Sequence, residues 1–97
     1  MRVVSHERGF WYFLEKGNKC YLDVNCSLPL VDISILVELS AEECSEYQAR
    51  GRKALQSFAM RISSSPKDYF GRNADERVQK EALDAIKEWQ TRDRSLS

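Results

Sequence analysis

Residues 10–26 read FWYFLEKGNKCYLDVNC, and this segment predicts a β-hairpin. Its opening run of aromatic and aliphatic side chains suits a pleated sheet. Gly17-Asn18 then lies between Lys16 and Lys19. A two-residue Gly-Asn loop is a strong hairpin signal, so the chain is expected to turn here and to return as a second strand.

The turn sets which side chains share a face of the hairpin, because pairing of Lys16 with Lys19 fixes the register. One face then collects mostly apolar side chains: Trp11, Phe13, Cys20, Leu22, Val24 and Cys26. The opposite face, called the outer face, collects aromatic and polar side chains: Phe10, Tyr12, Leu14, Tyr21, Asp23 and Asn25. The first face is therefore expected to pack on the core.

A third strand is predicted over residues 31–39, where apolar and polar side chains alternate with a period of two. Leu36 is the exception, because it falls among the polar positions and joins the outer face. Pro29 lacks a backbone N–H for a central ladder, so it is expected in the connection. Residues 9–39 therefore predict a three-stranded antiparallel meander, preceded by an N-terminal segment, 1–8.

A first amphipathic helix is predicted over residues 40–62. Ser40 and Glu43 form a capping box, in which each side chain satisfies a backbone N–H of the first turn. The apolar side chains step by three or four residues along Cys44, Tyr47, Leu55, Phe58 and Ile62. Gly51 falls in the same stripe, although a glycine inside a helix is unfavourable by up to ~1 kcal/mol relative to alanine. We therefore expect the helix to approach the sheet closely at Gly51.

A second helix follows a loop. A serine run, a proline and a glycine interrupt the helical pattern over 63–72, which predicts the loop. The helix is predicted over 73–91, with Asn73 and Glu76 as its capping box. Its apolar stripe consists of Val78, Ala82, Ile86 and Trp89. The tail, 92–97, is expected to be frayed.

These elements together predict an α+β fold: a three-stranded antiparallel β-meander followed by two amphipathic helices packed on one face of the sheet (βββαα). The length of 97 residues fits a single domain, 1–97, since domains usually contain roughly 100–150 residues. Hydrophobic residues make up 42% and charged residues 31%, which indicates a globular rather than a disordered chain. In this arrangement the chain itself leaves the outer face uncovered.

Composition also restricts location and partners. Lys+Arg and Asp+Glu are equal at 15 each, so the net charge gives no long-range attraction to nucleic acid or to acidic membranes. No apolar run is long enough for a secretory signal or a membrane span. The three cysteines are expected to be reduced thiols in a cytoplasmic protein.

No motif for catalysis, a metal or a cofactor stands out. The potential metal ligands, Cys20, Cys26, Cys44 and His6, lack the spacing of a zinc site. Cys44 lies near a helix start, where a thiol can be activated, but its place in the apolar stripe favours a structural role. The acids of the outer face, Asp23, Asp32 and Glu38, fit a solvated surface better than acid–base catalysis. We therefore expect a non-enzymatic protein without a metal or cofactor.

The outer face is the strongest functional feature. A contiguous apolar and aromatic patch usually marks an interface, and the candidate interface comprises Phe10, Tyr12, Leu14, Tyr21, Asp23 and Leu36. Three readings stay open: the Val3-Val4 segment or the 63–72 loop covers the face, a second copy pairs with it, or a partner protein binds it. The main hypothesis is a small non-enzymatic protein-interaction module, for example an inhibitory or immunity-type protein that blocks a basic target such as a nuclease.

Two alternatives accompany this hypothesis. The first is nucleic-acid binding by the first predicted helix and the loop after it, with a candidate basic patch of Arg50, Arg52, Lys53, Arg61 and Arg72. The zero net charge and the acids of the outer face argue against it, because a nucleic-acid surface concentrates Lys and Arg. The second is a homodimeric structural protein in which two outer faces pair.

Overall fold

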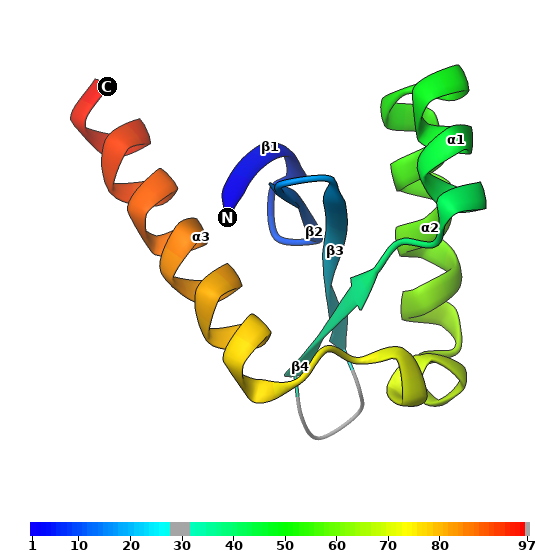
Figure 1. Ribbon diagram of the computed structural model, residues 1–97. Helices are drawn as coiled ribbons and strands as arrows, with labels where there is room; N and C mark the ends of the chain where they lie inside the picture. The colour runs from blue at the N-terminus through cyan, green and yellow to red at the C-terminus, as the bar shows by residue number, and fades with distance from the viewer. Residues whose placement is uncertain (28–31, 97) are drawn as a thin grey trace.

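The structure, a computed structural model, describes residues 1–27 and 32–96. Within them lies one antiparallel sheet of four strands in the order β1-β2-β3-β4, namely β1 (Arg2–Glu7), β2 (Trp11–Lys16), β3 (Lys19–Ser27) and β4 (Asp32–Glu38). The helices that follow are α1 (Ala41–Arg50), α2 (Arg52–Ser64), the 3-10 helix η1 (Pro66–Arg72) and α3 (Glu76–Leu96). The class is therefore α+β, as predicted (Figure 1).

The predicted hairpin register is confirmed. β2 and β3 pair with Lys16 opposite Lys19, Phe13 opposite Leu22 and Trp11 opposite Val24. β4 extends the meander on the far side of β3. The connection around Pro29 and the predicted strand start at Val31 lie outside the described residues.

The prediction of three strands is short by one, because the N-terminal segment forms β1 at the edge of the sheet. The register shifts between Val3, which lies opposite Leu14, and Ser5, which lies opposite Phe13. Val4 is therefore the extra residue of a β-bulge. The bulge places Val3 and Ser5 on opposite faces, so the period of two that identifies a strand is absent from the sequence.

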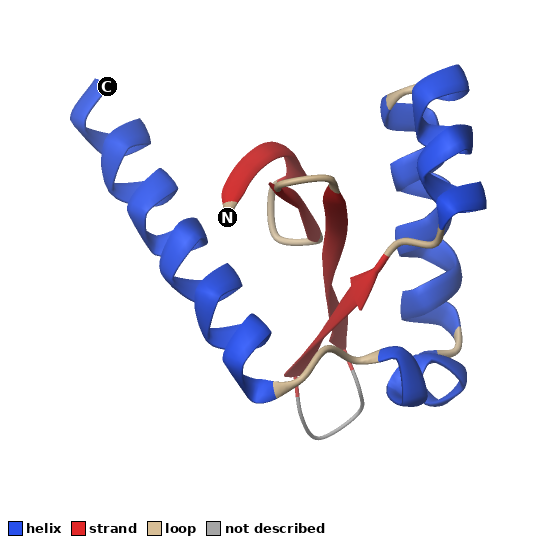
Figure 2. Ribbon diagram, viewed as in Figure 1, coloured by secondary structure: helices blue, strands red, loops and turns tan. Residues whose placement is uncertain are grey.

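The α-helices cover both faces of the sheet, which is thus the middle of three layers (Figures 1 and 2). α1 and α2 lie on one face, and the core between them and the sheet includes Trp11, Phe13, Leu22, Leu55 and Ile62. α3 lies on the outer face, where Leu14, Tyr21 and Leu36 are buried in one cluster with Ala82 and Ile86. The prediction that both helices pack on one face is wrong. Burial of the apolar side chains of the outer face is also favourable in free energy, and α3 provides that burial.

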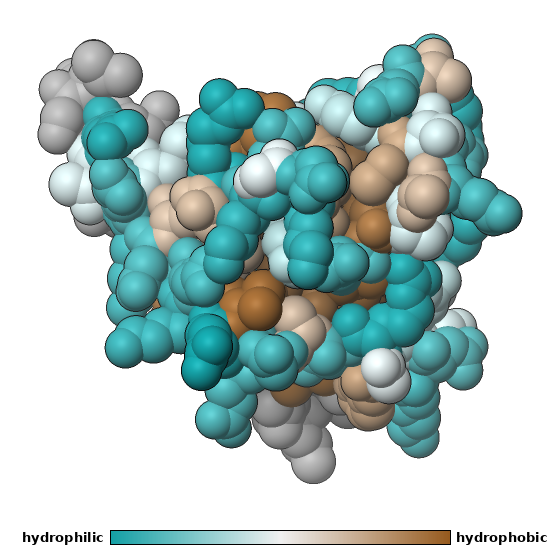
Figure 3. All heavy atoms as spheres, viewed as in Figure 1, coloured by the Kyte–Doolittle hydropathy of each residue, from teal (hydrophilic) through white to brown (hydrophobic). Residues whose placement is uncertain are grey.

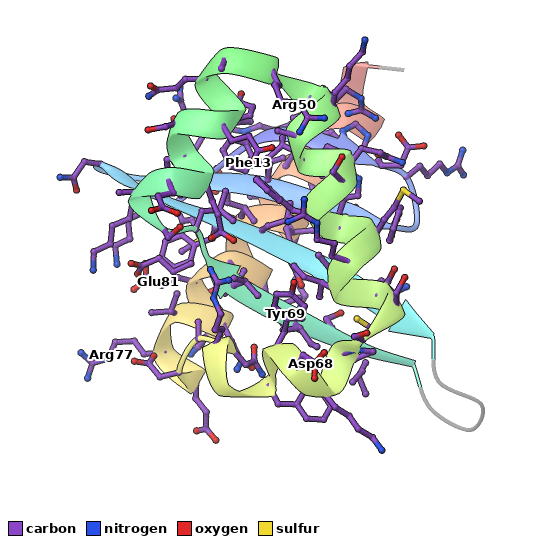
Figure 4. All side chains as sticks on the ribbon, turned by 90° about the vertical axis from the view of Figure 1, so that its right-hand side faces the viewer. Phe13, Arg50, Asp68, Tyr69, Arg77 and Glu81 are labelled. Carbon is purple, nitrogen blue, oxygen red and sulfur yellow. The ribbon has the colours of Figure 1, made fainter. Side chains whose placement is uncertain are left out.

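The predicted helix 40–62 is interrupted at Gly51. Gly51 has a φ of 67°, a left-handed value that residues with a side chain rarely adopt. α1 therefore ends at Arg50, and α2 runs back alongside it (Figure 4). A Cβ atom at Gly51 would meet no atom within 4 Å, so the predicted close approach to the sheet is absent. Glycine is needed here because the backbone turns with a positive φ.

The prediction that Asn73 caps the last helix is wrong. Its Oδ1 accepts a hydrogen bond from the Leu36 N–H at 3.0 Å, and the Ala74 N–H donates to the Leu36 carbonyl at 2.8 Å. The segment after η1 therefore satisfies backbone groups on the outer edge of β4. Asp75 caps α3 instead, and its Oδ1 accepts from the Val78 N–H at 3.0 Å.

The segment predicted as the 63–72 loop is largely helical. η1 carries the chain past the edge of β4, from the layer of α1 and α2 to the layer of α3 (Figure 1). Tyr69 of η1 packs on the core beneath α1 and α2, so this segment does not cover the outer face. α3 runs to Leu96, past the predicted fraying point at 92. In the described part of the chain, no helix combines the length and apolar character needed to cross a bilayer.

Replacing Gly51 by alanine is expected to lower the free energy of unfolding by about 1 kcal/mol or more, because a side chain disfavours a positive φ. Gly71→Ala is the matched control, since Gly71 has no positive φ and an added Cβ there also meets no atom within 4 Å. Urea denaturation of both variants measures the difference. Equal stability of the two variants would contradict the role assigned to Gly51.

Candidate binding cleft

The register of the sheet arranges the outer face in rows of neighbouring side chains. One row across β2, β3 and β4 consists of Tyr12, Asp23 and Leu36. In the next row, Asn25 lies opposite Ser34, and its N–H donates to the Phe10 carbonyl at 2.8 Å. Leu36 is buried, whereas Asn25 and Ser34 are exposed. The cover that α3 provides therefore ends between the two rows.

Two hollows open where this cover ends. The aromatic hollow, of about 280 Å³, is lined by Gly9, Phe10, Tyr12, Asp23, Asn25 and Ser34. The helix hollow, of about 360 Å³, has an α3 wall formed by Glu76, Gln79, Lys80, Ala82 and Leu83. Its sheet wall is formed by Asp23, Ser34 and Leu36. Because Asp23 and Ser34 line both hollows, the two adjoin, and together they are called the Asp23 cleft.

Apolar surface stays open beside α3. On the face shown in Figure 3, hydrophobic atoms reach the surface between α3 and the sheet, and hydrophilic side chains surround them. Leu83, on the wall of the helix hollow, is 51% exposed, and Phe10 is half-buried. The cleft therefore combines a few polar groups with apolar walls, as ligand sites usually do.

Asp23 is the chemically distinctive residue of the cleft. It is half-buried, and its carboxylate makes no hydrogen bond and no ion pair with any side chain or backbone group that the structure describes. Burial raises the pKa of Asp23 from its ordinary value of 3.8 to about 6, because removal from water disfavours the charged form. A carboxyl group with a perturbed pKa in a cleft is a candidate functional group.

Glu43 shows what a partner does to a carboxylate in the same fold. Burial alone would raise the pKa of Glu43, but hydrogen bonds from Arg72 and Ser40 outweigh it and lower the pKa. The Arg72 guanidinium lies 2.6 Å from Glu43 Oε1. Asp23 has no such contact, so the cost of its partial burial is not offset within the described chain.

The described neighbours of Asp23 in the aromatic hollow are uncharged. The Tyr12 hydroxyl accepts a hydrogen bond from Gln90 Nε2 at 3.0 Å, which ties its ring to α3. Asn25 uses Nδ2 to donate to the Gly9 carbonyl at 3.4 Å, which leaves its Oδ1 as an acceptor. The described residues of the hollow therefore present hydrogen-bond acceptors and aromatic rings around the Asp23 carboxylate.

The structure divides the candidate interface residues into two groups. Phe10, Tyr12, Asp23 and Leu36 line the cleft, where Leu36 is itself buried and Phe10 also packs against the core under α1 and α2. Leu14 and Tyr21 are buried beneath α3 and are closed to a partner in this conformation. The wall formed by Gln79, Lys80 and Leu83 was not predicted, because the apolar stripe of a helix does not specify which face of a sheet the helix covers. The apolar side chains of the outer face could have indicated this wall, because an apolar sheet face has to be buried against another element.

The basic side chains of the alternative patch do not form one surface. Ion pairs join Arg50 to Glu46, Arg52 to Glu7 and Arg72 to Glu43. Arg50 lies at the turn between α1 and α2, at the far end of this layer from η1, which carries Arg72 (Figure 4). Lys53 and Arg61 lie on α2. Acidic partners therefore offset much of this positive charge locally.

The three cysteines are free thiols. Burial, together with the neighbouring Cys44 thiol, raises the pKa of Cys20 from 9.0 to about 11, and burial also raises the pKa of Cys26. These two thiols are therefore protonated, and poor nucleophiles, near neutral pH. Cys44 Sγ donates to the Leu39 carbonyl at 3.9 Å. Within the two described ranges, no group of three His, Cys, Asp or Glu side chains is placed to hold a metal ion.

Comparisons of the chain with protein-family models, with curated proteins and with solved structures find no match. Function is therefore inferred from the geometry of the Asp23 cleft. Three properties of the cleft bear on function: a carboxylate without a partner among the described residues, aromatic walls and exposed aliphatic surface beside them.

Asp23→Asn is expected to stabilise the fold at neutral and higher pH. Because its pKa is raised in the folded state, Asp23 contributes most stability below its ordinary pKa of 3.8 and loses that contribution as the pH rises through about 6. Asparagine avoids this loss, so the free energy of unfolding should rise by about 2 kcal/mol near about pH 8 and change little near about pH 4. Urea denaturation at both pH values measures the effect.

The matched control for this prediction is Asp84→Asn. Asp84 is exposed on α3 and does not line the cleft, so this variant removes the same charge at another place. Because Asp84 is exposed, this variant should not gain the stability expected of Asp23→Asn near about pH 8. A loss of stability in Asp23→Asn near about pH 8 would reveal a stabilising partner of Asp23 and would contradict the description of the cleft.

Proposed function

We propose that this chain is a small non-enzymatic protein-interaction module, and that it binds a partner protein by receiving a basic side chain of that partner in the Asp23 cleft. The observation that carries the proposal is the half-buried Asp23 carboxylate without a hydrogen bond or ion pair in the described residues. A basic side chain would supply the charge-assisted hydrogen bonds that such a carboxylate lacks.

The charges that line the cleft favour a cation. Among the described residues that line the aromatic hollow, Asp23 is the single charged side chain. In the helix hollow Glu76 and Lys80 offset one another, which again leaves the charge of Asp23. An anionic ligand would meet this negative charge, whereas a cation would neutralise it.

The surroundings of Asp23 suit a protein partner. Phe10 and Tyr12 on one side and Leu83 on the other offer apolar surface that would exclude water from the bound charge. Desolvated centres with aromatic residues are typical of the residues that dominate binding energy at protein interfaces. A basic protein target agrees with an inhibitory or immunity-type role, which is one use of such a module.

Peptides selected from a random library displayed on phage are expected to contain Arg or Lys when the immobilised chain is the bait. The reason is the unpaired Asp23 charge, so Asp23→Asn should lose this enrichment while Asp84→Asn keeps it. Sequencing of the selected pools measures the enrichment. Selection of the same basic peptides by Asp23→Asn, or of acidic peptides by the unmodified chain, would contradict the proposal.

A second copy of the chain is the competing occupant, and light scattering over a concentration series distinguishes it. The account predicts the same monomer mass for the unmodified chain and for Asp23→Asn. A dimer that dissociates on Asp23→Asn substitution would instead show that the cleft receives a basic side chain of another copy, and the proposed partner protein would be wrong.

Binding of a selected peptide is expected to weaken in mild acid. Protonation of Asp23 removes the charge that the cation needs, so below about pH 6 the affinity should fall by roughly tenfold per pH unit. Titration calorimetry between about pH 8 and about pH 5 measures this. Affinity that is constant over this range would show that the Asp23 charge does not contribute to binding.

A further inference from the structure

Building on the proposed function, we infer that the Asp23 cleft recognises two side chains of its partner at once: an arginine in the aromatic hollow and an aliphatic side chain in the adjoining helix hollow. The two hollows differ in chemistry, although Asp23 and Ser34 belong to both. Each hollow therefore selects a different side chain. Because the two hollows adjoin, the two selected side chains have to be near neighbours on the partner.

The aromatic hollow is rich in acceptors. Asp23 offers a carboxylate, Asn25 offers Oδ1 because its Nδ2 is used by the Gly9 carbonyl, and Ser34 offers a hydroxyl. Neither Lys nor Arg is among the described residues that line this hollow. A guanidinium is the complement of such a set, since it carries several N–H donors in a fixed plane and no acceptor.

The rings of this hollow favour arginine over lysine. Tyr12 lies directly across from Asp23 in the sheet, and its ring is held by Trp89, with ring centroids 5.8 Å apart. Phe10 lines the same hollow. A planar guanidinium can pair with a carboxylate through two hydrogen bonds and also stack on an aromatic face, whereas a strongly hydrated ammonium group cannot do both.

The helix hollow offers an apolar site next to that carboxylate. Its apolar wall is formed by Leu36, Ala82 and Leu83, and the Leu83 side chain is 51% exposed. An aliphatic side chain in this hollow would remove Leu83 and itself from water, which favours binding in proportion to the apolar area buried. Gln79 and Lys80 add polar groups to the lining of the same hollow.

A series of capped synthetic peptides tests this assignment. Each peptide contains one arginine and one leucine separated by glycine spacers of increasing length, and matched series carry lysine or citrulline for arginine, or serine for leucine. NMR titrations of the full chain measure the dissociation constants. The best arginine–leucine peptide is expected to bind roughly fivefold more tightly than its lysine counterpart and at least about tenfold more tightly than its citrulline and serine counterparts.

Variants of the chain separate the two hollows. Leu83→Ser should abolish the preference for leucine over serine and leave the preference for arginine over citrulline, because Leu83 lines the helix hollow alone. Asp23→Asn should abolish the preference for arginine and leave that for leucine. Met60→Ser on α2 is the matched control for Leu83→Ser, since Met60 is 56% exposed and lies outside the cleft, and it should change neither preference. Coupling between each variant and each peptide change is read from double-mutant cycles.

Two outcomes would overturn the assignment, and they differ in what they imply for the proposed function. If lysine and arginine peptides bind equally and both need Asp23, or if Leu83→Ser weakens leucine and serine peptides alike, the recognition of two side chains is wrong and the interaction module stands. If no basic peptide depends on Asp23, the proposed function is wrong as well.

Discussion

The large apolar side chains on the outer face of the sheet have to be buried, and the path of the chain follows from that requirement. Leu14, Tyr21 and Leu36 lie on adjacent strands of that face, and each would expose a large apolar side chain without a cover. Burial of such a side chain contributes about 1.5–3 kcal/mol. Ala82 and Ile86 of α3 provide the cover, so the chain has to cross from one side of the sheet to the other. η1 lies in the segment that crosses, and the hydrogen bond between Asn73 and Leu36 holds this segment against the edge of β4.

The same constraint creates the cleft. Asp23 lies between Tyr12 and Leu36 in one row of the sheet, so the helix that buries Leu36 also draws the Asp23 carboxylate partly out of water. The cover ends before the next row, where Asn25 and Ser34 are exposed. A carboxylate at the boundary between a covered and an open row is accessible to a ligand and poorly solvated without one. This combination gives Asp23 both a raised pKa and a capacity to bind a cation.

The local patterns of the sequence predicted local structure well. The Gly17-Asn18 turn set the register of β2 and β3, and that register correctly placed Tyr12 and Asp23 on one face. The strand β1 was missed because the bulge at Val4 removes the alternation on which strand prediction depends. Gly51 was assigned to a helix interior because its position in an apolar stripe carries no information about its φ.

The cleft could be predicted only in part, since one of its walls is a tertiary feature. The sheet wall follows from the register, which groups Tyr12, Asp23 and Leu36. The α3 wall depends on which face of the sheet the last helix covers, and an amphipathic stripe does not specify that choice. Asn73 illustrates the same difficulty, because its hydrogen bond to Leu36 competes with helix capping and is invisible in the local sequence.

The function proposed for the chain depends on an Asp23 carboxylate that is half-buried, has no partner among the described residues and is open to a cation. The most direct measurement is its pKa, from a ¹³C NMR titration of the side-chain carboxyl group in the free chain and in the presence of an arginine-containing peptide. We expect a pKa of about 6 for Asp23 in the free chain and a lower value when the peptide is bound. A pKa at or below the ordinary value of 3.8 in the free chain, unchanged by the peptide, would mean that Asp23 is solvated or already paired, and would contradict the account.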